Sequence, residues 1–187
     1  MARPLDHRKR AELLAGVVTF IASRGLAELS LRPLAAALGT SSRMLIYYFG
    51  TKEELLVQAL ATQRPDLAAV FADVTDPGQL RDRLISFCEL NTAGAESESV
   101  RVLLQVLGAA CAPDSPYQGY ANDAIATFVA ELAAALRRAG LVRDPEVVAT
   151  LLISGLRGII QDHVITGDRE RTQRAARALV DLALPAR

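Results

Sequence analysis

Residues 29–56 read LSLRPLAAALGTSSRMLIYYFGTKEELL. Pro33 falls in the first turn of a short helix, where its missing N–H costs nothing, and Gly39 can end that helix. The Thr-Ser-Ser run at 40–42 offers cap oxygens for a second short helix, which stops at Gly50. Two short helices joined by a tight, glycine-containing turn form a helix-turn-helix, whose second helix lies in the DNA major groove. This stretch therefore predicts a DNA-binding element.

The rest of the chain also divides into helices. Asp6 can cap a first helix, and Thr51 with Glu54 forms a capping box that opens a longer helix after the turn. Asp76-Pro77 and Asp144-Pro145 each place a cap before a proline at the first helical position. Alternating runs of Val, Ile and Thr are missing, which argues against strands. The pattern predicts an all-α protein of about nine helices: three before residue 50, and others near 52–72, 78–94, 97–112, 117–139, 145–166 and 168–184.

Composition and charge are consistent with a two-part helical protein. Of 187 residues, 51% are hydrophobic but only 5% aromatic, so Ala, Leu and Val must supply the core; disorder and collagen-like repeats are excluded. The net charge is zero, yet residues 1–50 hold seven Arg and Lys against three acids, which leaves −4 on the remainder. Binding to DNA phosphates depends on the local charge of a protein and not on its total charge. A basic N-terminal part joined to an acidic remainder is therefore typical of a DNA-binding protein that has a second function. We expect a helix-turn-helix DNA-binding domain at 1–50, joined through the fourth helix to an effector-binding and dimerisation domain at 51–187.

The sequence offers no signal for a membrane or for export. Its longest uncharged stretch, Val102–Pro113, has 12 residues, short of the ~18 to 20 that span a bilayer. Charged residues precede the first apolar helix and no cleavage site follows, which predicts a cytoplasmic protein without membrane contact. The excess of Arg over Lys and the abundance of Ala indicate a GC-rich bacterial genome.

Signals for catalysis are also missing. Cys88 and Cys111 lack the doublet spacing of a zinc site and are expected to be free, mostly buried thiols. There is no phosphate-cradling glycine loop and no Gly-x-Ser-x-Gly, and His7 and His163 complete no evident triad. We expect no catalytic residue, no metal, no cofactor and no enzymatic activity.

The helix-turn-helix segment resembles a known family. A pattern Gly-x-Ser-x-x-x-Leu-Tyr-x-x-Phe-x-x-Lys-x-x-Leu characterises the DNA-binding domain of the TetR (tetracycline-repressor-like) family. This chain departs from it at Ile46, where the family has its first aromatic residue; that change affects a contact rather than the fold, because the apolar i, i+4 pair remains. The resemblance covers about residues 8–56, and the remainder is similar only in helix count and length. The pattern is matched at Gly39, Ser41, Leu45, Phe49, Lys52 and Leu55.

The second short helix carries the expected DNA contacts. If Leu45, Tyr48 and Phe49 face the core, the opposite side points into the groove. There Ile46 can pack on a thymine methyl, and Arg43 can bind guanine O6 and N7, a contact worth ~1 to 3 kcal/mol of discrimination. Tyr47 and Lys52, with the turn serines, are assigned to phosphates, and the resemblance favours Arg32 as a further contact. The predicted DNA-binding residues are Arg32, Thr40, Ser41, Ser42, Arg43, Met44, Ile46, Tyr47, Tyr48 and Lys52. A core-facing aromatic helix is the alternative.

Polar residues within the apolar middle helices are candidates for a small-molecule site. Buried polar groups need partners, and several converging in an apolar cavity would describe an effector pocket. The resemblance implies an effector that binds in this region and releases DNA. For His163, an ordinary hydrogen-bonded helix histidine is the stronger alternative. The predicted ligand-binding residues are Asn91, Gln105, Tyr117, Tyr120 and His163.

One short recognition helix makes few base contacts, so two copies are expected to read half-sites about 34 to 36 Å apart. The last two helices are the candidates for a homodimer interface, because each has an apolar, low-profile side; packing within one chain is the alternative. The candidate interface residues are Val148, Leu151, Leu152, Gly155, Gly158, Ile159, Ala175, Ala178, Leu179 and Leu182.

These observations predict a ligand-responsive transcriptional regulator, most often a repressor in the family. It would act as a homodimer on a near-palindromic double-stranded DNA operator and be released by a small-molecule effector. The alternative is a helical ligand-binding or protein-interaction module that keeps the helix-turn-helix only as structure.

Overall fold

The computed structural model describes residues 6–64, 66–92, 96–140 and 144–184. Within these ranges the secondary structure consists of α-helices joined by turns and loops, with no strand, which confirms the predicted all-α fold class. The chain divides into two compact units, Met1–Arg64 with Glu98–Ala121, and Pro65–Ser97 with Asn122–Arg187. The described helices are α1 (His7–Arg24), α2 (Leu31–Ala37), α3 (Ser42–Phe49), α4 (Lys52–Ala61), α5 (Leu67–Phe71), α6 (Pro77–Thr92), α7 (Glu96–Ala110), α8 (Gln118–Arg138), α9 (Pro145–Thr166) and α10 (Arg169–Ala183).

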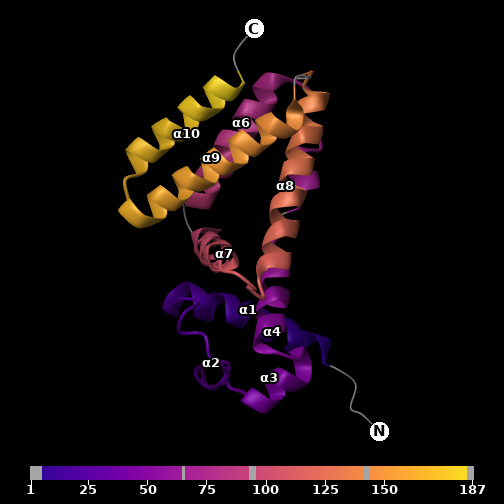
Figure 1. Cartoon of the computed structure of the whole chain (residues 1–187), viewed down its shortest axis with the longest axis vertical. Helices are drawn as coiled ribbons and strands as arrows, with labels where there is room; N and C mark the ends of the chain where they lie inside the picture. Colours follow the sequence, from indigo (N-terminus) through magenta and orange to yellow (C-terminus); the bar gives the residue numbers. More distant parts are fainter. Residues whose placement is uncertain (1–5, 65, 93–95, 141–143, 185–187) are drawn as a thin grey trace. The chain divides into compact units, whose positions relative to one another are not determined.

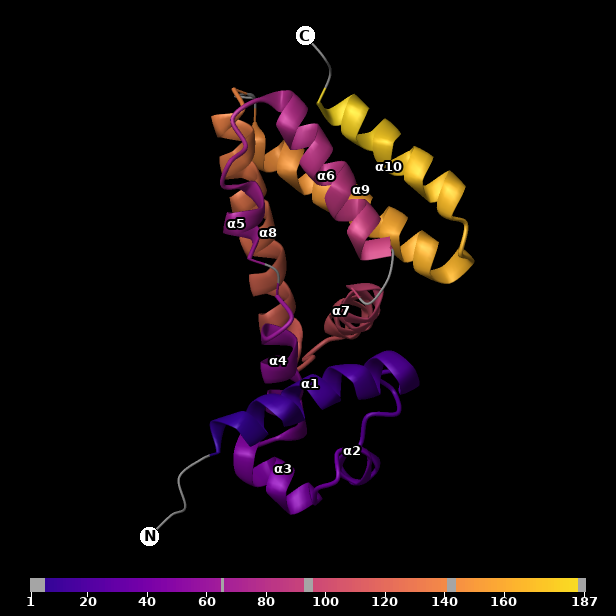
Figure 2. The ribbon, with the colours of Figure 1, turned by 180° about the vertical axis from the view of Figure 1, so that it is seen from behind.

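The first unit contains the helix-turn-helix and its support. Helix α1 packs on α2 and α4, and α3 packs on both α2 and α4 (Figure 2). The apolar residues that recur along α1 face this core: Val17 and Ile21 are fully buried, as are Leu34 of α2 and Leu45 of α3. Since α4 lies in the same unit, the predicted functional division at residue 50 stays a prediction.

Local capping signals set most of the helix ends in this unit. An Asp6 carboxylate oxygen accepts a hydrogen bond from the Lys9 backbone N–H at 3.0 Å, which fixes the start of α1. Thr51 and Glu54 form the predicted capping box of α4. Gly39 has φ +61 in the tight turn between α2 and α3, a conformation that favours glycine.

The prediction of one helix over residues 52–72 is wrong. Helix α4 ends at Ala61, and a separate short helix, α5, begins at Leu67 after Asp66 accepts a hydrogen bond from the Ala69 N–H at 3.0 Å. The sequence places Pro65 between the two helices, and a proline inside a helix removes a hydrogen bond and clashes with the preceding turn. This break explains why the described residues form ten helices rather than the predicted nine or so.

The two Asp-Pro signals have different outcomes. Asp76 accepts a hydrogen bond from the Gln79 N–H at 3.0 Å and caps α6 as predicted. Asp144 does not cap α9, because its backbone is left-handed (φ 48, ψ 58) and its side chain makes no capping hydrogen bond. An N-cap side chain reaches the first turn from extended backbone, which Asp144 does not adopt.

The second unit is built around α6, α9 and α10. Helix α10 lies against both α9 and α6, and α6 also contacts α9 (Figure 1). The buried residues of α9 follow the helical period and face this core together with Leu80 and Leu84 of α6 and Val180 of α10. They are Ala149, Leu152, Ile153, Leu156 and Ile160.

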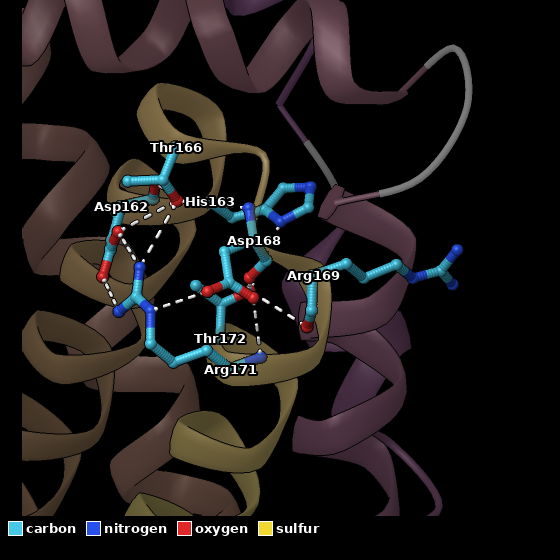
Figure 3. Close-up of polar contacts among 7 residues, drawn as sticks. All are labelled: Asp162, His163, Thr166, Asp168, Arg169, Arg171 and Thr172. Carbon is cyan, nitrogen blue, oxygen red and sulfur yellow. Dashed lines mark hydrogen bonds and ion pairs between the residues drawn. The ribbon is translucent and has the colours of Figure 1, made fainter.

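An ionic cluster closes the turn between α9 and α10. The Arg171 guanidinium donates to both carboxylate oxygens of Asp162, at 2.6 and 2.7 Å, and to Asp168 at 3.1 Å (Figure 3). These hydrogen bonds lower the pKa of Asp162 and raise that of Arg171. Because the bidentate pair joins the end of α9 to the start of α10, it ties the two helices into one hairpin.

Only part of the predicted dimer surface is available to a partner. Leu152 is fully buried within the chain, and a Cβ at Gly155 would overlap the Leu179 side chain of α10, so these residues pack inside the subunit. The exposed face of α9 includes the predicted residues Leu151 and Gly158, and it also carries Val147 and Ile165. One reason for the error is that α9 is apolar on more than one side, so the pattern alone could not choose the inner face.

Helix α9 is also long and apolar enough, by length and composition, to cross a membrane, and only 22% of the qualifying stretch is buried. Core helices of water-soluble proteins pass the same test, and α9 packs against α6 and α10 and carries Arg157 and Asp162. One such helix is therefore weak support for a membrane span.

Candidate nucleic-acid interface

Helix α3 presents one buried side and one open side. Its start is fixed by Ser41, whose hydroxyl oxygen accepts a hydrogen bond from the Met44 N–H at 3.2 Å. Leu45 is fully buried and Phe49 is 4% exposed, so this i, i+4 pair anchors the helix on α2 and α4. Anchoring on one side leaves the other side of α3 free to meet a partner.

The open side of α3 carries large side chains. Ile46 is 42% exposed and Tyr47 is 56% exposed, with Met44 and Arg43 also exposed beside them. Three large apolar or aromatic side chains on the surface of a short helix, next to a guanidinium, form a small contact surface of mixed chemistry. The apolar side chains can pack on thymine methyl groups, and the guanidinium can form hydrogen bonds with guanine. This surface is therefore suited to bind in a DNA major groove.

Tyr48 occupies an intermediate position. It is half-buried, and its ring lies edge-on to Tyr47 at 5.6 Å between centroids and tilted to Phe49 at 5.9 Å. The core side of α3 is therefore Leu45 and Phe49, with Tyr48 at the margin. Packing against its neighbour restricts the Tyr47 ring and presents it in a defined direction.

The remaining predicted DNA-binding residues flank α3 in the same unit. Arg32 is exposed on α2, and Thr40 and Ser42 are half-buried around the turn. Lys52 is half-buried in the first turn of α4, with its Nζ 3.5 Å from a carboxylate oxygen of Glu53. That pair is only partly shielded from water and holds the ammonium weakly. The start of α4 therefore combines a loosely held cation with the positive end of a helix, a combination suited to phosphate contacts.

Two residues that the sequence pattern does not indicate contact Phe49 on the buried side of α3. Arg10 of α1 has its guanidinium carbon 5.4 Å from the centroid of the Phe49 ring, and it donates a hydrogen bond to the Gln58 side-chain oxygen. The amide of Gln58, on α4, in turn donates to the Phe49 backbone oxygen at 3.4 Å. No pattern in the sequence signals the contact between Arg10 and Gln58, because the two residues are 48 positions apart.

The predicted ligand-binding residues are divided between the two units. Gln105 of α7 belongs to the first unit, where its side-chain oxygen accepts from the Leu26 N–H at 2.6 Å, just after α1. Tyr120, in the same unit, lies under the Arg64 guanidinium at 4.5 Å. Tyr117 is buried there; burial raises its pKa, and the charge of Glu53 raises it further.

Asn91 and His163 belong to the second unit. Asn91 donates to the Phe87 backbone oxygen at 2.7 Å within α6, and a ring nitrogen of His163 lies 3.3 Å from the Thr172 hydroxyl on α10 (Figure 3). Among the hydrogen bonds of the described residues, none joins two of these five side chains. Their role in ligand binding stays a prediction, although each already has a partner within the chain or, for Tyr117, a buried position.

The cysteines and acidic residues form no evident reactive centre in the described parts of the chain. Cys88 is buried as expected, whereas Cys111 is exposed, which corrects the expectation of mostly buried thiols. Across the described ranges there is no group of three or more His, Cys, Asp or Glu side chains that could hold a metal ion.

Comparison with known proteins agrees with this geometry. Residues 13–59 match the sequence model described as "Bacterial regulatory proteins, tetR family". No curated protein matches the chain significantly.

Solved structures share the fold along nearly the whole chain. A transcriptional regulator from Rhodococcus sp. is 22% identical, with 94% of this chain and 95% of that one covered and a TM-score of 0.79. The TetR-family regulator PfmR from Thermus thermophilus is 25% identical (94% and 99% covered, TM-score 0.67). A regulator from Saccharomonospora viridis, solved with choline, is 24% identical (93% and 94% covered, TM-score 0.72).

A short helix with one exposed side, supported by three other helices, is the arrangement of a helix-turn-helix DNA-binding domain. The chain has the fold and the DNA-binding domain of a TetR-family transcriptional regulator, which confirms the resemblance seen in its sequence.

Proposed function

We propose that the protein is a ligand-responsive transcriptional repressor that binds a near-palindromic operator as a homodimer. The observation that carries this proposal is the open side of α3, where Arg43, Ile46 and Tyr47 are exposed above a buried Leu45 and Phe49. Arg43 and Ile46 would read bases, while Tyr47 and Lys52 would hold phosphates.

The homodimer is proposed from the second unit. Its exposed apolar residues on α9 and α10 include Leu151 at 60%, Ile165 at 73% and Leu182 at 82%. Exposed apolar side chains of this size on two adjoining helices are expected where subunits meet. A twofold axis would then present two recognition helices to half-sites about 34 to 36 Å apart, so the operator would be near-palindromic.

The effector is proposed to act by shifting a conformational equilibrium. A small molecule lowers DNA affinity only if it binds the DNA-incompetent state more tightly, and such coupling is typically ~1 to 3 kcal/mol. The neighbour from Saccharomonospora viridis was solved with choline, so this fold accommodates a small molecule in at least one relative. Because the target is DNA in a bacterial cell, we place the protein in the cytoplasm.

Binding-site selection tests the DNA part of this proposal. The purified protein is mixed with a random duplex library and with fragments flanking its own gene, and enriched sequences are measured by gel shift. We expect a two-half-site motif. Tyr47→Ala with Lys52→Ala should abolish the shift while circular dichroism stays unchanged, since both side chains are at least partly exposed.

A matched control removes similar groups elsewhere. Arg101→Ala with Ile125→Ala takes away one cation and one exposed apolar side chain outside α3, and it should bind as the unmodified protein does. Absence of any selected sequence, with and without small molecules from a thermal-shift screen, would favour the alternative of a helical module without DNA function.

A further inference from the structure

Arg10, Phe49 and Gln58 meet on the inner side of the recognition helix. They come from α1, α3 and α4, three helices that pack together in the first unit (Figure 2). Arg10 donates to the Gln58 side-chain oxygen, and the Gln58 amide donates to the Phe49 carbonyl at 3.4 Å. The Arg10 guanidinium also lies over the Phe49 ring, 5.4 Å from its centroid. These contacts among Arg10, Gln58 and Phe49, which we call the relay, therefore link the start of α1, the middle of α4 and the end of α3.

The relay stabilises the C-terminal end of α3, where the helix cannot supply hydrogen-bond donors for its own carbonyl groups. The last four carbonyls of any helix lack partners within the helix, and Phe49 is the last residue of α3. A helix of eight residues is too short to be stable alone, so contacts with neighbouring helices set its orientation. Gln58 gives the free Phe49 carbonyl a donor. Because Arg10 donates to the Gln58 oxygen, it fixes which side of that amide faces Phe49.

The cation over the ring adds a second constraint. Phe49 is 4% exposed and Arg10 is half-buried, so the guanidinium and the ring are partly shielded from water, where such contacts are stronger. Gln58 is also half-buried. The three groups thus fix both the backbone and the side chain of Phe49, the final residue of α3, whose ring is buried while Ile46 and Tyr47 are exposed.

We propose that Arg10 and Gln58 are positioning residues for DNA recognition: they orient α3 so that its exposed side chains enter the groove at the correct angle. This inference rests on the proposed DNA-binding function. Neither residue needs to touch a base, and Gln58 carries no charge that could bind phosphate.

The test compares Gln58→Leu with a matched control, Gln118→Leu, which makes the same change at an exposed position in the same unit. Affinities are measured for the selected operator and for a version with one base pair changed, at several salt concentrations. Gln58→Leu should weaken operator binding about threefold to tenfold, as expected for lost hydrogen bonds. It should also lower the preference for the operator over the changed site, with an unaltered salt slope. Gln118→Leu should change none of these.

Substitution of Arg10 shows whether this residue positions α3 through Gln58 or binds DNA directly. If Arg10 acts through Gln58, then Arg10→Ala and Gln58→Leu each give the loss, and the double variant loses little more. If Arg10 binds a phosphate instead, Arg10→Ala reduces the salt slope by about 0.9 and the two effects add; that result would overturn the inference for Arg10.

Thermal melting shows whether each variant is folded, and Gln58→Glu is a second substitution at this position. It keeps an oxygen for Arg10 but places a carboxylate oxygen against the Phe49 carbonyl, and its charge repels DNA, so we expect operator binding no stronger than that of Gln58→Leu. Operator binding and preference unchanged in Gln58→Leu would refute the positioning role. Failure of the unmodified protein to select any sequence would instead refute the proposed DNA function, so the two failures are distinct.

Discussion

Arg43 is the residue on which sequence preference should depend most. It is exposed on α3 beside Ile46, where its guanidinium can bind a guanine through two hydrogen bonds. Arg43→Ala should relax the preference at one base position per half-site, with a loss of ~1 to 3 kcal/mol at the preferred base. A binding assay on all single-base variants of the selected operator measures this.

The control for Arg43 is another arginine of the first unit. Arg24 lies over the Phe20 ring at 5.5 Å at the end of α1, so Arg24→Ala should leave the preferred base unchanged. If Arg43→Ala weakens every operator variant equally, Arg43 holds a phosphate rather than a base.

The two thiols should differ sharply in reactivity. Cys88 is buried on α6, and burial, reinforced by Glu89, raises its pKa from 9.0 to about 11; Cys111 is exposed. At pH 8 a thiol reagent should label Cys111 first and reach Cys88 only on unfolding, as followed by mass spectrometry. Equal labelling rates in the native protein would contradict the buried placement of Cys88.

The raised pKa of Cys88 also affects stability at high pH. Because the pKa of this thiol is higher in the folded protein, the unfolded chain releases the proton first, so the thiol lowers the free energy of unfolding as pH rises from about 9 to about 11.

At the scale of helices, the junction between α3 and α4 should tolerate substitution poorly. Gly50 has φ +85, and a Cβ there would overlap the Glu54 carboxylate oxygen that completes the capping box. Gly39 also has a positive φ, +61, but nothing lies within 4 Å of its Cβ position. Gly39→Ala should therefore lower the free energy of unfolding by about 1 to 2 kcal/mol because of backbone strain. Gly50→Ala should lower it by about 1 kcal/mol more because the cap is disturbed as well.

Urea unfolding of the two variants measures this difference in the free energy of unfolding. Thr51→Ala removes the cap hydroxyl together with an exposed methyl group and leaves both glycines in place, so its loss should come mainly from the cap. Equal losses in Gly39→Ala and Gly50→Ala would mean that Glu54 moves aside without a stability cost.

Most helix boundaries could be predicted because their signals are local. A cap such as Asp6, the Thr51–Glu54 box and the turn glycine Gly39 act over three or four residues, and the structure places each as expected. The two wrong predictions have local causes too: Pro65 interrupts the helix predicted over 52–72, and Asp144 has a capping side chain on left-handed backbone.

For the whole molecule, assembly is the property to test. Leu151 is 60% exposed on the open face of α9, so Leu151→Glu should place charges within the proposed interface and shift the protein toward monomer without unfolding it. Analytical ultracentrifugation measures this shift, and operator affinity should fall with it. Ile125→Glu is the control, since Ile125 is 39% exposed on α8; it should leave assembly unchanged. An unmodified protein that is monomeric at micromolar concentration would exclude the homodimer.

The helical class, the helix-turn-helix and the exposed side of α3 follow from periodicity and turn chemistry, which depend on neighbouring residues alone. Long-range partners needed the tertiary structure. Gln105 and Leu26 are 79 residues apart, and Arg64 and Tyr120 are 56 apart, so no local pattern pairs them. The inward face of α9 was likewise decided by packing, because Leu179 fits only where Gly155 lacks a side chain. A polar or apolar residue shows what kind of partner it needs, whereas three-dimensional packing determines which partner it finds.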